Sequence, residues 1–115
     1  MPEWFGTDGL RGKAGQFPLD EPTVFNLGQA LVVLLGEKNL PPLVLIGRDT
    51  RESSPWLENV LRSGIVSAGG RVDSAGVIPT SAISLLTRDE KFSAGIVISA
   101  SHNPYDDNGI KIFQP

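Results

Sequence analysis

The stretch from Ser99 to Gly109, SASHNPYDDNG, concentrates the side chains of this chain that are best suited to chemistry. It places the hydroxyl of Ser101 directly before His102, the single histidine among the 115 residues. A hydroxyl next to an imidazole could act as a nucleophile with a general base. A hydrolase triad is disfavoured, because no acidic partner that would orient His102 is evident. The plain alternative for Ser101 is a loop serine that bonds to the local backbone.

The acidic pair Asp106-Asp107 in the same stretch invites the interpretation of a metal site. However, the letters Asp-Asp-Asn-Gly are typical of a tight turn, and Asn108-Gly109 suits the positive φ angles of a hairpin. We therefore expect a turn at this position rather than a pair of metal ligands.

Three segments show the apolar periodicity of helices that pack on a core. The first covers residues 21–38, with Asp20 as its N-cap, and the second begins at Ser54-Pro55 and ends at Gly69-Gly70. A third, shorter helix is expected to start near Thr80.

Short apolar runs between these helices, at 43–46, 71–75 and 95–98, indicate strands. Because strands that alternate with helices form parallel sheets, we expect these three to be parallel, in the order second, first, third. Residues 109–113 alternate in polarity and follow too closely for a crossover helix, so this strand should lie antiparallel beside the third. The predicted fold is α/β, with three α/β/α layers and a four-stranded mixed sheet in the order 2-1-3-4.

This topology decides which loops meet. The segments GRDTR (47–51), GVIPT (76–80) and SASHNP (99–104) follow the three parallel strands and therefore emerge at the same edge of the sheet. Ligands bind at this edge in such sheets. Lys111, on the last strand, would return beneath the loop that carries His102.

The charged residues of GRDTR admit two interpretations. Arg48 and Arg51 could form the rim of a phosphate site, because the fork of a guanidinium suits phosphate. Alternatively, they form with Asp49 an ion-paired turn that fixes the loop after the first strand, and we favour this second interpretation.

Composition excludes several classes of protein. Ten Lys and Arg against 13 Asp and Glu give a net charge of −3, which lacks the basic surface of a nucleic-acid binder. The absence of cysteine excludes disulfides and thiolate metal ligands. The longest apolar run, 30–35, is far below the roughly 20 residues that cross a membrane, and the first residues lack a signal-peptide pattern. We expect a single soluble, cytoplasmic domain without nucleic-acid or membrane partners.

Four motifs occur in order along the chain: FGTDGLRG (5–12), GRDTR (47–51), GVIPTSA (76–82) and GIVISASHNPYDDNGIKIF (95–113). Together they resemble the first domain of the α-D-phosphohexomutases over nearly the whole chain. One departure is Ser81, where related sequences usually carry proline; this position touches a helix N-terminus, and the departure leaves the implied catalytic roles unchanged. The resemblance implies that residues 1–115 form domain I of a phosphoglucomutase-type enzyme, with the remaining domains absent from this chain.

The resemblance also implies a role for each candidate site residue. Ser101 would be a phosphoserine that donates its phosphoryl group to a hexose phosphate and recovers it from the other position, through a hexose bisphosphate. His102 would orient this serine or bind a phosphoryl oxygen. Arg11 and Lys111 would contact phosphate or transfer a proton. Mg²⁺ would be held mainly by carboxylates of an absent domain, so that only Ser101 of this chain touches the metal.

The implied activity is that of an intramolecular phosphotransferase, an isomerase that interconverts glucosamine 6-phosphate and glucosamine 1-phosphate as part of a longer enzyme. Its partners would be the hexose phosphate substrate and a hexose bisphosphate activator, and a homodimer is compatible with the resemblance. The alternatives are a mutase of the same family acting on mannose or glucose phosphates, and a non-catalytic α/β module that binds an anion or a protein. The isolated chain is expected to fold without turning over substrate, because groups needed for transfer belong to the absent domains.

Overall fold

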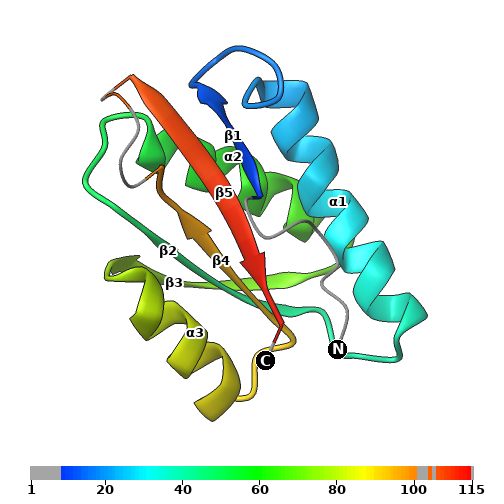
Figure 1. Cartoon of the computed structure of the whole chain (residues 1–115). Helices are drawn as coiled ribbons and strands as arrows, with labels where there is room; N and C mark the ends of the chain where they lie inside the picture. Colours follow the sequence, from blue (N-terminus) through cyan, green and yellow to red (C-terminus); the bar gives the residue numbers. More distant parts are fainter. Residues whose placement is uncertain (1–8, 101–103, 105, 115) are drawn as a thin grey trace.

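The structure is a computed structural model that describes residues 9–100, 104 and 106–114. A mixed sheet lies between helices on both of its faces (Figure 1). The elements are β1 (Leu10–Lys13), α1 (Glu21–Glu37), β2 (Leu43–Arg48), α2 (Ser54–Ser67), β3 (Arg71–Val77), α3 (Thr80–Asp89), β4 (Ala94–Ile98) and β5 (Asp107–Phe113). Within the described ranges, no helix has the length and apolar character needed to span a membrane.

The sheet has five strands in the order β1-β5-β4-β2-β3, so the predicted number of four strands is wrong; the predicted order 2-1-3-4 corresponds to β3-β2-β4-β5 and omits β1. The parallel pairs β2–β3 and β2–β4 and the antiparallel pair β4–β5 are those expected from the sequence. The missing strand is β1, which pairs antiparallel with the outer edge of β5. Only four residues long, β1 offers no periodic pattern, and its strand conformation depends on pairing with a segment almost 100 residues away.

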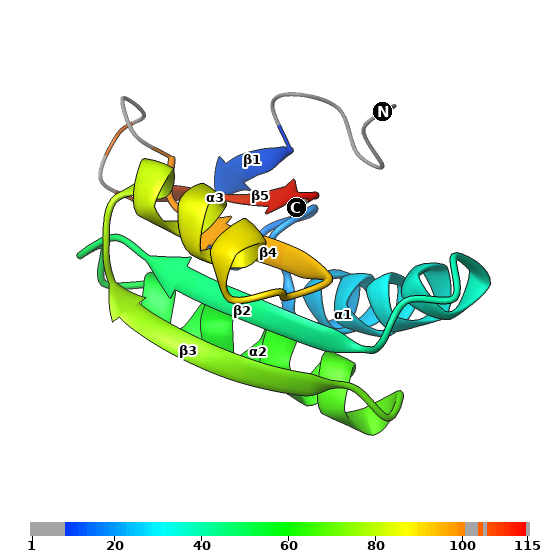
Figure 2. The same ribbon diagram turned by 90° about the horizontal axis from the view of Figure 1, so that it is seen from below.

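The core has two parts, one on each face of the sheet, which gives the three predicted layers. Helices α1 and α2 pack on one face and α3 packs on the other, as Figure 2 shows. The strands alternate accordingly. Ile46 and Ile96 face α1 and α2, whereas Leu45 and Val97 face α3. Strands β2 and β4 are therefore buried on both sides, as their continuous apolar runs predict.

Helices α1 and α2 approach each other closely at a pair of glycines. A Cβ atom added to Gly28 of α1 would lie 2.6 Å from the carbonyl oxygen of Leu61 in α2. A Cβ atom added to Gly64 of α2 would overlap the carbonyl oxygen of Phe25 in α1. The two glycines thus allow a backbone-to-backbone contact that any larger residue would separate.

The expected hairpin turn at Asn108-Gly109 is wrong. Both residues lie within β5 and neither has a positive φ, and Asn108 pairs with Gly12 of β1. The side chain of Asn108 is fully buried, and its Nδ2 donates to the hydroxyl oxygens of Ser53 at 2.8 Å and Ser54 at 2.9 Å. The local turn preference of Asn-Gly is overridden because strand pairing and a buried side-chain contact both hold the segment extended.

Helix α1 begins with the predicted cap. Oδ2 of Asp20 accepts hydrogen bonds from the Thr23 hydroxyl at 2.9 Å and the Thr23 backbone amide at 3.3 Å. The bond from the Thr23 hydroxyl is the main reason that the pKa of Asp20 falls below its ordinary value of 3.8. The ionised carboxylate therefore stabilises the folded state above the ordinary pKa, and this contribution is lost as the pH falls through the lowered pKa.

Asp20→Ala is expected to lower the melting temperature at pH 7, because it removes both bonds at the first turn of α1. The difference from the unsubstituted chain should shrink as the pH falls from 3.8 through the lowered pKa of the native carboxylate, because the unfolded chain takes up a proton first. Thermal unfolding followed by circular dichroism at pH 7 and pH 3 measures both effects. Asp89→Ala, which removes an exposed carboxylate at the end of α3, serves as the control. A pH-independent difference for Asp20→Ala would contradict the argument.

Candidate functional site

The loops that follow β2, β3 and β4 meet at one edge of the sheet, as the predicted parallel arrangement requires. The amide of Asp49, just after β2, donates to the carbonyl of Ile98 at the end of β4. The amide of Ile78, just after β3, donates to the carbonyl of Arg48. The segment between β4 and β5 starts at this edge (Figure 1). We refer to residues 99–109 as the serine loop.

Ser101 and His102, the central residues of the expected site, lie outside the described residues. The structure describes instead the two arms of the serine loop, a first arm of Ser99 and Ala100 and a second arm of Pro104 and residues 106–109. The amide of Ser99 donates to the carbonyl of Gly109 at 2.9 Å, and the amide of Asp107 donates to the carbonyl of Pro104 at 3.0 Å. Ala100 is fully buried. The arms are therefore joined to each other where β4 ends and β5 begins.

Arg11 and Lys111 lie on the same face of neighbouring strands. Arg11 is directly opposite Gly109, and Lys111 lies two residues after Gly109 and directly opposite Val97. Opposite residues of antiparallel strands share a face, as do residues two apart on one strand. Val97 belongs to the core on the α3 side, so both cations lie on that side of the sheet.

The environments of the two cations differ. Lys111 is half-buried, and its ammonium group lies 5.3 Å from the centre of the Phe113 ring, a distance at which cation and ring attract each other. Arg11 is exposed on β1. Because α3 packs on β2 and β4, the strands β1 and β5 that carry these cations lie beside its main contact area. The arrangement can supply positive charge close to the serine loop.

The expected ion-paired turn in GRDTR is confirmed for Asp49 and Arg51. Nε of Arg51 lies 3.0 Å from Oδ2 of Asp49, and the backbone amide of Arg51 donates to Oδ1 at 3.0 Å. The Ser54 hydroxyl donates to the same Oδ1 at 2.7 Å, which ties the turn to the start of α2. The Arg51 side chain also reaches the serine loop, a contact that the local sequence does not reveal.

Arg48 points to helix α2 instead of the rim of a phosphate site. Its Nη1 donates to Oε1 of Glu58 at 2.9 Å, and Glu58 is almost fully buried. The Ser74 hydroxyl and the guanidinium of Arg62 also contact the carboxylate of Glu58. The rim interpretation is therefore wrong for Arg48, which neutralises a buried carboxylate between α2 and the sheet.

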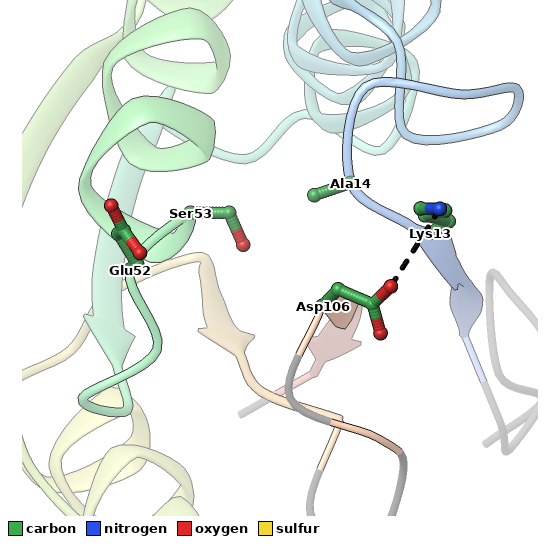
Figure 3. Close-up of a pocket in the computed structure, with 5 residues that line it drawn as sticks. All are labelled: Lys13, Ala14, Glu52, Ser53 and Asp106. Carbon is green, nitrogen blue, oxygen red and sulfur yellow. Dashed lines mark ion pairs between the residues drawn. The ribbon is translucent and has the colours of Figure 1, made fainter.

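A pocket of about 290 Å³ lies beside the second arm of the serine loop (Figure 3). It is lined by Lys13, Ala14, Glu52, Ser53 and Asp106. The Lys13 ammonium lies 3.7 Å from Oδ2 of Asp106, and both side chains are more than half exposed, so this pair is weak. Two carboxylates against one ammonium make the lining unsuited to a phosphate group. Sequence reasoning missed this pocket because its residues come from three distant segments.

Comparison with known proteins identifies relatives over the whole chain. Residues 2–115 match the domain family described as phosphoglucomutase/phosphomannomutase, alpha/beta/alpha domain I. The phosphoglucosamine mutase of Koribacter versatilis is 59% identical over 109 residues, which cover 95% of this chain and 24% of that protein. The phosphoglucosamine mutase of Thermus thermophilus is 51% identical over 115 residues, which cover 100% of this chain and 26% of that protein. The chain thus spans about a quarter of the length of these relatives.

Solved structures show the same fold. The crystal structure of a Thermus thermophilus protein assigned as a phosphomannomutase matches with a TM-score of 0.82 at 32% identity, over 99% of this chain and 26% of that one. A phosphoglucomutase/phosphomannomutase family protein from Burkholderia thailandensis matches with a TM-score of 0.75 at 29% identity, over 92% of this chain and 24% of that one. The chain therefore belongs to the phosphoglucomutase/phosphomannomutase family, of which it forms the alpha/beta/alpha domain I.

Proposed function

We propose that this chain is the phosphoserine-bearing domain of a mutase that interconverts glucosamine 6-phosphate and glucosamine 1-phosphate. The observation that carries the proposal is the position of Arg11 and Lys111 on one face of β1 and β5, next to the arms of the serine loop. The preference for glucosamine phosphates is supported by relatives that are themselves named phosphoglucosamine mutase.

The proposed reaction has two balanced phosphoryl transfers. In the first, the bond between phosphorus and Oγ of Ser101 breaks, a bond from phosphorus to the free hydroxyl oxygen of the sugar phosphate forms, and the hydroxyl proton passes to a base. The product is a hexose bisphosphate and a serine that is ready to accept. In the second transfer, the bond between phosphorus and the sugar oxygen at the other position breaks, a bond from phosphorus to Oγ of Ser101 forms, and the released sugar oxygen takes up the proton that the base received. The serine is thereby restored to its phosphorylated form.

In this reaction Arg11 and Lys111 would balance the negative charge of the phosphoryl group. A phosphoserine carries a charge of about −1.5 to −2 near neutral pH, and fixed positive groups must balance the charge that moves with the phosphoryl group. Lys111 is proposed to contact a phosphoryl oxygen or carry the transferred proton, and Arg11 to contact phosphate. His102 is proposed to orient Ser101 or bind a phosphoryl oxygen.

Magnesium is the metal that the family resemblance implies, and Ser101 is the residue of this chain that would contact it. Two described carboxylates near the serine loop do not fit a magnesium site, because Asp49 is paired with Arg51 and Asp106 lies next to Lys13. In the part of the chain that the structure describes, no three Asp, Glu or His side chains gather as metal ligands.

The full-length protein that contains this domain tests the proposal. Purified protein incubated with a hexose bisphosphate is expected to carry one phosphate, which peptide mapping by mass spectrometry should locate on Ser101. Kinetics on the phosphates of glucosamine, mannose and glucose should then give the highest kcat/KM for glucosamine.

The alternatives predict different results. Phosphorylation of Ser101 together with a clear preference for mannose or glucose 1-phosphate would keep the mutase and change its sugar; the phosphomannomutase assignment of the Thermus thermophilus crystal structure makes mannose the leading alternative. A protein that never carries phosphate on Ser101 and converts none of the three sugars would instead favour a non-catalytic binding module.

A further inference from the structure

We infer that Arg51 is a positioning residue that holds the second arm of the serine loop, an inference that rests on the proposed function of that loop. Nη1 of Arg51 donates to the carbonyl oxygen of Pro104 at 2.7 Å and to that of Asp107 at 3.2 Å. These two carbonyls belong to the arm that follows Ser101 in the sequence. A side chain from the loop after β2 thus holds the backbone of the loop after β4 in place through two hydrogen bonds.

The guanidinium is well placed to act as a rigid link. Its Nε is fixed by Oδ2 of Asp49 at 3.0 Å, and the side chain is only 11% exposed. A planar guanidinium has several donors in a fixed geometry, so Arg51 can satisfy the carboxylate and both carbonyls together. A lysine has the same charge but cannot reproduce this pattern of donors.

The link continues into helix α2. Asp49 also accepts a hydrogen bond from the hydroxyl of Ser54, the first residue of α2. The same hydroxyl accepts a bond from the buried amide of Asn108, at the beginning of β5. The second arm of the serine loop is therefore connected to one rigid helix by two routes, through Arg51 and through Asn108.

The pairing with Asp49 also distinguishes the role of Arg51 from that of an arginine that binds phosphate. A close carboxylate neutralises its charge, and its Nε and Nη1 donate to protein oxygens. Loss of Arg51 should therefore disturb the position of the reacting serine and have little effect on the affinity for the sugar phosphate. Misplacement of a reacting group by about 1 Å can cost on the order of 10²-fold in rate.

The test compares Arg51→Gln and Arg51→Lys in the full-length protein. For Arg51→Gln we expect kcat to fall about 10²-fold, with KM for the sugar phosphate changed by less than about twofold. The rate at which Ser101 is phosphorylated by hexose bisphosphate, measured by quenched-flow mass spectrometry, should fall by a similar factor. Arg51→Lys should lie between Arg51→Gln and the unsubstituted protein. The matched control is Arg71→Gln, because Arg71 is 74% exposed and pairs only with Asp73 among the ion pairs of the described residues.

Each outcome bears on the inference. A kcat that is unchanged in both Arg51 variants would overturn it, and so would a raised KM with an unchanged kcat, which would make Arg51 a phosphate ligand. If Arg51→Gln fails to fold, the split between kcat and KM in Arg51→Lys decides in the same way. Failure of the proposed function is recognised separately, because the unsubstituted protein itself would then carry no phosphate on Ser101 and convert no sugar phosphate.

Discussion

Ser101→Ala in the full-length protein is expected to abolish turnover, with kcat reduced by a factor on the order of 10⁴ or more. In the proposed reaction the serine oxygen is bonded to the migrating phosphoryl group before and after each cycle, so its removal eliminates the covalent route altogether. Loss of a nucleophile has effects of this size in other enzymes that use covalent catalysis. The measurements are steady-state kinetics on glucosamine phosphates and the intact mass after incubation with hexose bisphosphate.

Ser81→Ala is the matched control, because it removes an exposed hydroxyl near the start of α3. It should keep both the activity and the added phosphate. A Ser101→Ala protein that still gains a phosphate would move the phosphorylation to another residue. One that turns over normally without any phosphate would remove the phosphoenzyme from the mechanism.

The sequence predicted the layers of the fold and most strand pairs because those features depend on patterns repeated over several residues. The helices α1 and α2 have apolar stripes, and β2 and β4 have continuous apolar runs between turn residues. The strand β1 has neither, since Leu10 is its only apolar side chain. Its backbone bonds are made with β5, and a partner this distant in the sequence leaves no local signal.

In the candidate site, too, some features could be predicted from the sequence and others could not. The alternation of residues 109–113 was sufficient to place Lys111 and Phe113 on one face and Ile110 and Ile112 on the other, and the structure has this arrangement. The contacts of Arg51 with the serine loop could not be predicted, because the acceptors are backbone carbonyls and carry no residue-specific signal. Its charge predicted an ion pair, but the position of the loop beside it depends on how β2 and β4 pair.

Asn108 shows a local signal that points to the wrong conformation. Asn-Gly is among the strongest turn signals in a sequence, and the chain does turn shortly before it, at Asp106. The asparagine itself is used for a different purpose, since its amide links β5 to the hydroxyls at the start of α2. The short polar side chain of Asn108 can reach both hydroxyls, and this buried contact outweighs its preference for a turn.

Gly64→Ala is expected to reduce the free energy of unfolding by about 3 kcal/mol, the largest effect on stability that we predict. In an unconstrained helix the same change would stabilise by roughly 1 kcal/mol, because alanine has the higher helix propensity. At Gly64 the new methyl group would overlap the carbonyl oxygen of Phe25, so α1 and α2 would have to separate along their contact. Separation loosens the buried side chains of both helices, and natural domains are stable by only about 5–15 kcal/mol in total.

Gly36→Ala provides the matched control within the same pair of helices. Gly36 lies in the last turn of α1, and among the described residues no atom outside its chain neighbours and the nearby backbone of its own helix lies within 4 Å of the position that its Cβ would occupy. This variant should be neutral or more stable by up to about 1 kcal/mol, since only helix propensity and the entropy of the unfolded chain act there. Urea unfolding of the 115-residue chain, followed by circular dichroism, measures both variants. The two substitutions are chemically identical. Equal changes in the free energy of unfolding would therefore mean that α1 and α2 do not meet backbone to backbone at Gly64. A loss of stability for Gly64→Ala with a gain for Gly36→Ala would locate the close contact at Gly64.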